Sequence, residues 1–477
     1  MPKYFGTDGI RGVAGVDLTT DLAHRVGLAA GRVFAARMVL LARDTRPSGP
    51  ALEAACADGL AAAGAEVHLA GILPSPAVSH LVRRERYDLG VVISASHNPP
   101  QDNGIKLYDG QGLKLSPEEE DRVEALFDAR MEPGRRGATV VRADAAAVYR
   151  SLLRSAVPRL SLAGLRVAVD CAHGATCGLA PGLFAELGAD VVPLGGEPDG
   201  TRINATGAAA LGPLQEAVRQ SGVDLGIAFD GDGDRVMFVD AQGQPVEGDR
   251  LLAALAPLLW RWKEISSPAV VVTVLANMGT EEYLRDHGIR VMRVPVGDRN
   301  VAWAMRREGI ELGGEPSGHI VFGRHAPTGD GILTALLALQ VLRRAEMSLG
   351  DLVTPVPTYP QVREDVPVAN REVALAAPSV QRAIGDAERL LDGRGRLIVR
   401  RSGTQSLVRV VAEGPDEASL RLAVAKVTGA LDPFRDEQLV GEHAAGSGPA
   451  RRTPDPPDPA SVSEHDLGSE SRHGAVF

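Results

Sequence analysis

Residues 165–194 read LRVAVDCAHGATCGLAPGLFAELGADVVPL and show the pattern that recurs along the chain. LRVAVD (165–170) is a short apolar run typical of a buried strand, GLAPGLFAELG (178–188) has the composition of a short helix, and ADVVPL (189–194) is typical of a second strand. A helix between two apolar strands predicts a β-α-β unit, in which helices cover the faces of a largely parallel sheet.

The same alternation occurs on both sides of this unit. Upstream, strands are predicted at 38–42, 67–73 and 89–93, and helices at 51–64 and after Ser116, a plausible N-cap that precedes Pro117 and three acidic residues. Downstream, strands are predicted at 224–230, 269–275 and 289–294, with a helix at 281–288. The predicted fold class is therefore α/β, with three similar α/β domains built on mixed or parallel sheets.

The pattern changes near 355–366, PVPTYPQVREDV, which is Pro-rich and typical of a linker. Beyond it, 397–414 predicts two strands joined by a loop and 416–431 predicts a helix, so a smaller C-terminal α+β domain is expected. From 441 onward, Pro, Gly, Ser and Asp without apolar periodicity predict a disordered tail. The expected domains are 1–155, 156–253, 254–365 and 366–440, followed by the tail 441–477.

Charge and hydropathy exclude several classes of function. A formal net charge of −10 over 477 residues argues against a nucleic-acid binder, although a few Arg and Lys side chains can still hold an anionic substrate. The longest apolar run, 251–260, is far shorter than the roughly 20 residues of a membrane-spanning helix. The N-terminus MPKYFGTDGIRG has no apolar signal-peptide core. A cytoplasmic protein with no membrane partner is expected.

The segment AFDGDGDRVMFVD (228–240) places Asp230, Asp232 and Asp234 within five residues, directly after an apolar strand. Such crowded carboxylates are costly unless a cation lies among them. A calcium loop of the EF-hand type would have Gly at 235 and Glu at 241, where this chain has Arg and Ala. Hard oxygen ligands favour Mg²⁺, and the alternative is a solvated turn.

The segment ISASHNPPQDNGIK (93–106) places Ser96 beside His97, ten residues before Lys106. Adjacent residues of an extended segment point to opposite sides, so a direct hydrogen bond between Ser96 and His97 is not expected. Ser96 is instead predicted to carry or accept a phosphoryl group, with Lys106 supplying positive charge or moving a proton. The alternative is a turn-rich loop with a solvated lysine.

Two further segments have the composition of ligand-binding loops. LGGEPSGHIVF (312–322) offers hydrogen-bonding groups for a polyhydroxylated ligand, and VRRSGTQSLVR (399–409) combines guanidinium groups, hydroxyls and backbone N–H groups that suit a phosphate. The alternatives are a polar glycine turn and an exposed basic hairpin. Arg11 in FGTDGIRG (5–12) and Arg299 in VGDRN (296–300) lie in weaker, Gly-containing turns.

These segments, with TGDG (328–331), follow one another in the order of the α-D-phosphohexomutase superfamily, over about residues 1–430. FGTDGIRG and the SGT loop are most similar to those of bacterial phosphoglucosamine mutases. The resemblance implies four domains around a central active-site cleft. It also implies an isomerase that interconverts glucosamine 6-phosphate and glucosamine 1-phosphate, through a phosphoserine enzyme and a bisphosphorylated sugar, on the route to UDP-N-acetylglucosamine.

The resemblance assigns roles to individual residues. Ser96 becomes the phosphoryl carrier and, with Asp230, Asp232 and Asp234, a ligand of Mg²⁺. The other implied site residues are Arg11, His97, Lys106 and His319 near the reacting oxygens, Glu315 and Ser317 at the sugar, Arg400, Ser402, Gly403, Thr404 and Arg409 at the distal phosphate, and Arg235 and Arg299 elsewhere in the site. A hexose phosphate substrate and activation by glucose 1,6-bisphosphate or glucosamine 1,6-bisphosphate are implied, and a homodimer stays open.

Three loops depart from the family pattern. SGTEP is Ser402-Gly403-Thr404-Gln405-Ser406 here, GGEQSGH has Pro316, and NCGSTHP is not recognisable in NATGAAALGP (204–213). Because two of these loops read or clamp the ligand, a mutase for glucose, mannose or N-acetylglucosamine phosphate stays open. So does a non-catalytic sugar-phosphate-binding paralogue, although such a protein would not need the retained phosphoryl carrier.

Overall fold

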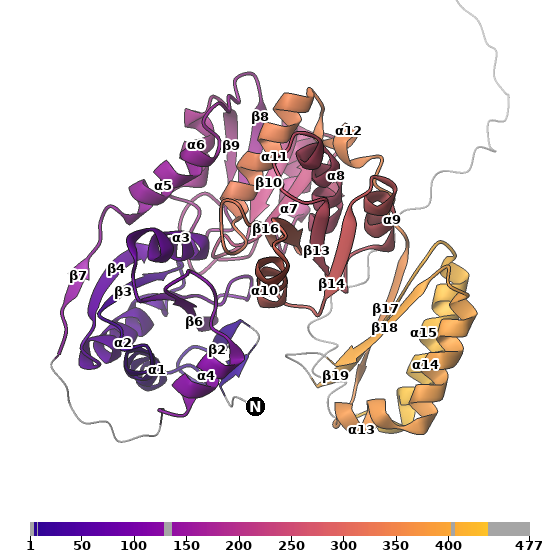
Figure 1. Cartoon of the computed structure of the whole chain (residues 1–477), viewed down its shortest axis with the longest axis horizontal. Helices are drawn as coiled ribbons and strands as arrows, with labels where there is room; N and C mark the ends of the chain where they lie inside the picture. The colour runs from indigo at the N-terminus through magenta and orange to yellow at the C-terminus, as the bar shows by residue number, and fades with distance from the viewer. Residues whose placement is uncertain (1–3, 7, 128–135, 402–405, 437–477) are drawn as a thin grey trace, which may run out of the picture.

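The computed structural model describes residues 4–6, 8–127, 136–401 and 406–436, and these form four consecutive units (Figure 1). Each unit is built on its own sheet, with seven, five, four and three strands in chain order. The strand orders are β1-β2-β6-β5-β3-β4-β7, β12-β11-β10-β8-β9, β14-β13-β15-β16 and β17-β19-β18.

The first two units hold the serine and aspartate segments. The elements of the first unit are β1 (Phe5–Gly6), β2 (Gly9–Val13), α1 (Thr20–Val33), β3 (Met38–Arg43), α2 (Gly49–Ala62), β4 (Glu66–Ile72), α3 (Ser75–Glu85), β5 (Leu89–Ile93), β6 (Asp102–Asp109), α4 (Pro117–Glu124) and β7 (Thr139–Val141). Those of the second are α5 (Ala145–Ala156), β8 (Arg166–Asp170), α6 (Ala180–Glu186), β9 (Asp190–Leu194), α7 (Gly212–Ser221), β10 (Leu225–Phe229), β11 (Val236–Asp240) and β12 (Pro245–Val246).

The last two units hold the GGEPSGH segment and the C-terminal strands. The elements of the third unit are α8 (Gly248–Arg261), β13 (Ala269–Thr273), α9 (Met278–Asp286), β14 (Arg290–Val294), α10 (Asp298–Glu308), β15 (Leu312–Gly314), β16 (Ile320–Phe322), α11 (Gly331–Ala345) and α12 (Leu349–Val353). Those of the fourth are β17 (Gln361–Pro367), α13 (Arg371–Ala376), α14 (Pro378–Leu391), β18 (Arg396–Arg401), β19 (Leu407–Glu413), α15 (Glu417–Leu431) and the 3₁₀ helix Asp432–Phe434.

The first three sheets share one topology. In each, parallel strands are followed by a strand that pairs antiparallel with the last of them: β6 with β5, β11 with β10, and β16 with β15. The predicted α/β class with mixed sheets is therefore confirmed. The fourth sheet is antiparallel throughout and has α14 and α15 packed on it.

Hydrophobic packing joins the first three units, because one continuous apolar core includes Leu81 of α3, Leu183 of α6 and Leu336 of α11. The fourth unit has its own core, which includes Val366, Val410 and Val424. Most of these side chains are aliphatic, in line with a chain that has only 4% aromatic residues. No helix of the described ranges is both long and apolar enough to cross a membrane.

A local signal in the sequence accounts for the start of α4. Ser116 caps α4 in a capping box, because its hydroxyl accepts the N–H of Glu119 at 3.1 Å while the carboxylate of Glu119 accepts the N–H of Ser116 at 2.8 Å.

The linker prediction at 355–366 is wrong in its second half. Gln361 begins β17, an edge strand that pairs with β19, where the proline at its end is tolerated. The predicted tail at 441–477 lies outside the described residues.

Candidate active site

Three equivalent loops bring the predicted site residues together. The β5–β6 loop carries Ser96, the β10–β11 loop carries the three aspartates, and the β15–β16 loop carries Glu315 and His319. Each loop leaves the carboxyl end of a buried parallel strand and returns along an antiparallel one. In α/β sheets ligands bind at this end of the strands, so the shared topology accounts for the position of the site.

Ser96 is almost fully buried, with 1% of its surface exposed, and its backbone is left-handed with φ of 53°. Its hydroxyl donates to Oδ2 of Asp230 at 2.7 Å, and its N–H donates to the hydroxyl of Ser94 at 2.9 Å. The expectation that Ser96 and His97 point apart is wrong, because Ser96 Oγ lies 3.4 Å from His97 Nδ1. The left-handed turn replaces the extended backbone on which that expectation rested.

Asp230, Asp232 and Asp234 form a buried carboxylate cluster that could hold a metal ion. Burial and the neighbouring Asp234 and Asp232 raise the pKa of Asp230 well above its usual range. Oδ1 of Asp232 and Oδ1 of Asp234 are buried and accept no hydrogen bond from any residue in the described ranges. A divalent cation would relieve the repulsion and satisfy these oxygens, so the donor set fits such an ion.

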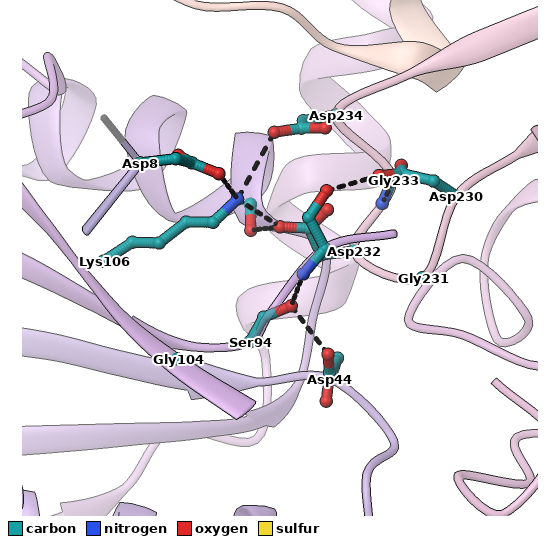
Figure 2. Close-up of polar contacts among 12 residues, drawn as sticks. Asp8, Asp44, Ser94, Gly104, Lys106, Asp230, Gly231, Asp232, Gly233 and Asp234 are labelled. Carbon is teal, nitrogen blue, oxygen red and sulfur yellow. Dashed lines mark hydrogen bonds and ion pairs between the residues drawn. The ribbon is translucent and has the colours of Figure 1, made fainter. Parts of the chain in front are cut away.

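Lys106 lies on β6 with its amino group surrounded by carboxylates (Figure 2). Nζ is 2.7 Å from Oδ2 of Asp232, 3.3 Å from Oδ2 of Asp8 and 3.4 Å from Oδ2 of Asp234. Burial lowers the pKa of Lys106, but these carboxylates outweigh it and hold the pKa well above its usual range. The side chain is therefore an ammonium ion that can stabilise charge on a nearby phosphoryl group.

The β15–β16 loop adds a histidine and a glutamate from the third unit. His319 Nε2 accepts the N–H of Gly329 at 3.0 Å, so the ring proton is on Nδ1, which lies 3.8 Å from Asp234. Glu315 accepts the N–H of Gly297 at 3.2 Å, and burial raises its pKa. Ser317 is half-buried in the same loop. The structure thus brings Ser96, Lys106, the three aspartates and His319 into one cluster.

Three further predicted residues, all basic or imidazole side chains, lie in or beside the serine and aspartate loops. Arg11 on β2 donates to Oδ1 of Asn98 at 3.2 Å and pairs with Asp8. Burial, together with the charges of Arg235 and Arg11, lowers the pKa of His97 to about 3, so this ring is neutral at physiological pH. Arg235 follows the aspartates, and its N–H donates to Oδ1 of Asp230 at 3.2 Å.

A cavity of about 1010 Å³ lies between the third and fourth units and reaches His97. Arg400 and Arg409, both in its lining, are directly opposite each other on β18 and β19. Burial and the neighbouring Arg409 lower the pKa of Arg400, whereas Arg409 is paired with Asp365 at 2.8 and 2.9 Å. A phosphate would offset this repulsion. The predicted Ser402, Gly403 and Thr404 lie outside the described residues.

Arg299 lies in an ion pair between units and is not among the residues that line this cavity. Its guanidinium donates to both oxygens of Glu120 at 2.7 and 2.9 Å, which joins α10 to α4. Next to it, Asp298 pairs with Lys114 of the first unit, which also contacts Asp8. These ion pairs hold the third unit against the first beside the carboxylate cluster.

Arg46 was missed by the sequence reasoning. It is fully buried after β3, and Nε donates to Oδ2 of Asp44 at 2.9 Å. Its terminal nitrogens donate to backbone oxygens of the serine loop, among them those of Ser96 at 3.0 Å and Asn98 at 2.8 Å. The hydroxyl of Ser94 donates to Oδ2 of the same Asp44 at 2.6 Å (Figure 2). In the sequence, RDTRPSG (43–49) indicates only a turn, because nothing local shows what its second arginine contacts.

Comparisons with known proteins agree with this architecture. Residues 2–133, 148–243 and 247–359 match the phosphoglucomutase/phosphomannomutase alpha/beta/alpha domains I, II and III, and residues 365–430 match the C-terminal domain. The chain is 44% identical over 438 residues to a phosphoglucosamine mutase of Saccharopolyspora erythraea, covering 90% of this chain and 98% of that one. A phosphoglucosamine mutase of Rhodospirillum rubrum is 43% identical over 442 residues, with the same coverage.

Solved structures show the same fold. A phosphoglucomutase/phosphomannomutase family protein of Burkholderia thailandensis has a TM-score of 0.78 and 26% identity, covering 91% of this chain and 99% of that one. An N-acetylphosphoglucosamine mutase of Aspergillus fumigatus, in complex with GlcNAc-6P and magnesium, has a TM-score of 0.67 and 18% identity, with 91% and 96% covered.

Three α/β/α domains, a C-terminal domain and a buried serine facing three carboxylates together define a phosphohexomutase. The chain belongs to the phosphoglucomutase/phosphomannomutase superfamily, also called the α-D-phosphohexomutases.

Proposed function

We propose that this chain is a cytoplasmic phosphoglucosamine mutase, which interconverts glucosamine 6-phosphate and glucosamine 1-phosphate. The observation that carries the proposal is the buried hydroxyl of Ser96, which lies 2.7 Å from Asp230 in a carboxylate cluster that also pairs, through Asp232, with the ammonium group of Lys106. Identities of 43–44% to phosphoglucosamine mutases over 90% of the chain support glucosamine phosphate as the substrate.

The proposed reaction transfers a phosphoryl group twice. The free sugar hydroxyl attacks phosphorus, the bond from phosphorus to Ser96 Oγ breaks, and a bisphosphorylated sugar forms. This intermediate turns over in the cleft, and its other phosphoryl group passes to Ser96 Oγ, which leaves the isomeric monophosphate. His319 takes the proton of the attacking hydroxyl and the ammonium group of Lys106 gives a proton to Ser96 Oγ as it leaves, with the two roles reversed in the second transfer. Lys106 and Arg11 stabilise the charge on the transferring group.

The carboxylate cluster fits Mg²⁺, which we propose is held by the phosphate of Ser96 together with Asp230, Asp232 and Asp234. Bound there, Mg²⁺ would neutralise charge on the transferring phosphoryl group. Glu315 and Ser317 contact sugar hydroxyls in this proposal, and Arg400 and Arg409 hold the phosphate that does not react. Ser402, Gly403 and Thr404 are assigned to the same phosphate from their resemblance to the family loop.

Asp232→Asn is expected to weaken Mg²⁺ binding and to lower turnover together. The substitution keeps the size of the side chain but removes one of three carboxylates, so the Mg²⁺ affinity should fall by about 10- to 100-fold or more. Titration of the dephosphorylated protein with Mg²⁺ by calorimetry, beside a kinetic assay, measures both effects. Asp240→Asn, at the far end of β11, is the matched control and should bind Mg²⁺ as the wild type does. Unchanged Mg²⁺ affinity in Asp232→Asn would contradict the metal assignment.

The substrate is tested by ³¹P NMR with Mg²⁺ and a catalytic amount of glucose 1,6-bisphosphate. Glucosamine, N-acetylglucosamine, glucose and mannose 6-phosphates are supplied separately, and glucosamine 6-phosphate is expected to be converted fastest. Preference for another sugar would move the assignment to that hexose phosphate and would point to Pro316 in the sugar loop. Conversion of none of them, by folded protein phosphorylated at Ser96, would overturn the proposed function in favour of a binding protein.

A further inference from the structure

Asn204 lies at the point where the serine loop of the first unit meets the aspartate loop of the second. Its side-chain amide donates to the backbone oxygens of Ser96 at 2.8 Å and Asn98 at 2.9 Å. The oxygen of the same amide accepts the N–H of Gly231 at 2.8 Å. One side chain therefore uses both of its amide N–H groups on the serine loop and its oxygen on the aspartate loop.

The backbone on both sides of this contact is unusual. Ser96 and Asn204 have φ of 53° and 62°, in the left-handed region that is sterically unfavourable for a residue other than glycine. Asn tolerates this conformation better than most residues, but Ser needs its surroundings to hold it there. The backbone oxygen of Ser96 accepts one hydrogen bond from Arg46 and another from Asn204. These bonds keep the serine turned so that its hydroxyl faces Asp230.

Gly231 shows how closely the two loops approach. A Cβ atom at this position would lie 2.7 Å from the backbone oxygen of Ser96 and 2.9 Å from Nδ2 of Asn204. No side chain fits between the loops, so their separation is set by backbone contact and by the amide of Asn204. Arg46 belongs to the same unit as Ser96, whereas Asn204 contacts the backbone of Ser96 from the second unit.

We infer that Asn204 is a positioning residue, which fixes the phosphoryl-carrying serine relative to the metal-binding carboxylates. The inference rests on the proposed function of Ser96. Asn204 contacts neither the sugar nor the reacting atoms in this scheme. It acts through the backbone of Ser96 and Gly231, and it does so from the segment 204–213, whose sequence departs from the family pattern.

Two substitutions separate the contacts of this amide. Asn204→Gly removes all three hydrogen bonds while it accepts the left-handed backbone, so backbone strain is not introduced. Asn204→Asp keeps the size and the oxygen that accepts from Gly231, but it turns a second oxygen toward the backbone oxygens of Ser96 and Asn98. Thr201→Gly is the control, because Thr201 is exposed shortly before Asn204 in the chain and its N–H and hydroxyl both donate to Oδ1 of Asp199.

Both variants are expected to lower kcat by about 100-fold, the loss that follows a misplacement of about 1 Å, while KM for the hexose phosphate stays within about threefold. Phosphorylation of Ser96 by glucose 1,6-bisphosphate in a single turnover should slow by the same factor. Hydrogen exchange of intact protein should rise in peptides covering 94–100 and 228–234 and nowhere else. Thr201→Gly should match the wild type in each measurement.

Wild-type kcat in Asn204→Asp would overturn the inference, because the contact with Gly231 alone would then suffice. Unchanged exchange in both loops of Asn204→Gly would overturn it equally. A wild-type protein that takes no phosphoryl group from the bisphosphate would instead overturn the proposed function. In that event the exchange measurement still decides whether Asn204 ties the two loops together.

Discussion

Replacing Ser96 with alanine is expected to lower turnover by at least about 10⁴-fold, while the Kd for the hexose phosphate stays within about threefold of the wild-type value. The bond between Oγ and phosphorus cannot form without the hydroxyl, so both phosphoryl transfers are lost. Binding should persist, because the residues proposed to contact the sugar and its distal phosphate, Glu315, Arg400 and Arg409, belong to other units. A coupled assay of turnover and calorimetry of hexose phosphate binding measure the two effects.

Backbone strain needs its own control in this experiment. Alanine at a φ of 53° carries a steric cost, which glycine avoids. Ser96→Gly should therefore lose turnover as fully as Ser96→Ala while it melts closer to the wild type. Intact-mass measurement after incubation with glucose 1,6-bisphosphate should show one added phosphoryl group on the wild-type protein and none on either variant. Turnover that survives in Ser96→Gly would contradict the assignment of Ser96 as phosphoryl carrier.

The elements of this fold could be predicted where their signals are local. The apolar runs 89–93 and 269–273 form strands in which every residue is buried. Such continuous apolar runs are typical of strands in a sheet that is covered on both faces. The cap at Ser116 depends on atoms three residues apart, and it was predicted correctly. The linker prediction fails at 361–366, the start of β17, because the pairing of Gln361 with Glu413 depends on a strand about 50 residues away.

The site residues likewise fall into those that local sequence signals predict and those whose roles depend on long-range contacts. The three aspartates could be predicted as a cluster because they are close in the sequence and their crowding is costly without a cation, whereas Ser96 was predicted from its place after an apolar strand and from the family resemblance. The roles of Arg46, Asn204 and Glu120 could not be found, because each acts through a contact more than 50 residues away in the sequence or across two units. Arg299 was assigned to the site from its motif, and in the structure its guanidinium pairs with Glu120 of α4.

Arg46→Met is expected to destabilise the first transition of thermal unfolding by about 3–5 kcal/mol, because it leaves a buried carboxylate without its cation. Arg46 and Asp44 are both fully buried, and burial already raises the pKa of Asp44 despite this arginine. The same change removes the donors that hold the backbone oxygens of Ser96, Asn98 and Asp102. Scanning calorimetry with matched protein concentrations measures the shift.

Three comparisons isolate the cause of that loss. Arg43→Met breaks the pair with Glu53, which is partly exposed, so it should cost about 1 kcal/mol or less. Adding Asp44→Asn to Arg46→Met should recover part of the stability, since the unpaired charge and not the missing contact carries most of the cost. Arg46→Lys keeps the charge but cannot span the several oxygens that the guanidinium reaches, so it should fall between the wild type and Arg46→Met. If Arg46→Met unfolds no earlier than Arg43→Met, the arginine does not hold the serine loop, and Asn204 remains as the tie from the second unit.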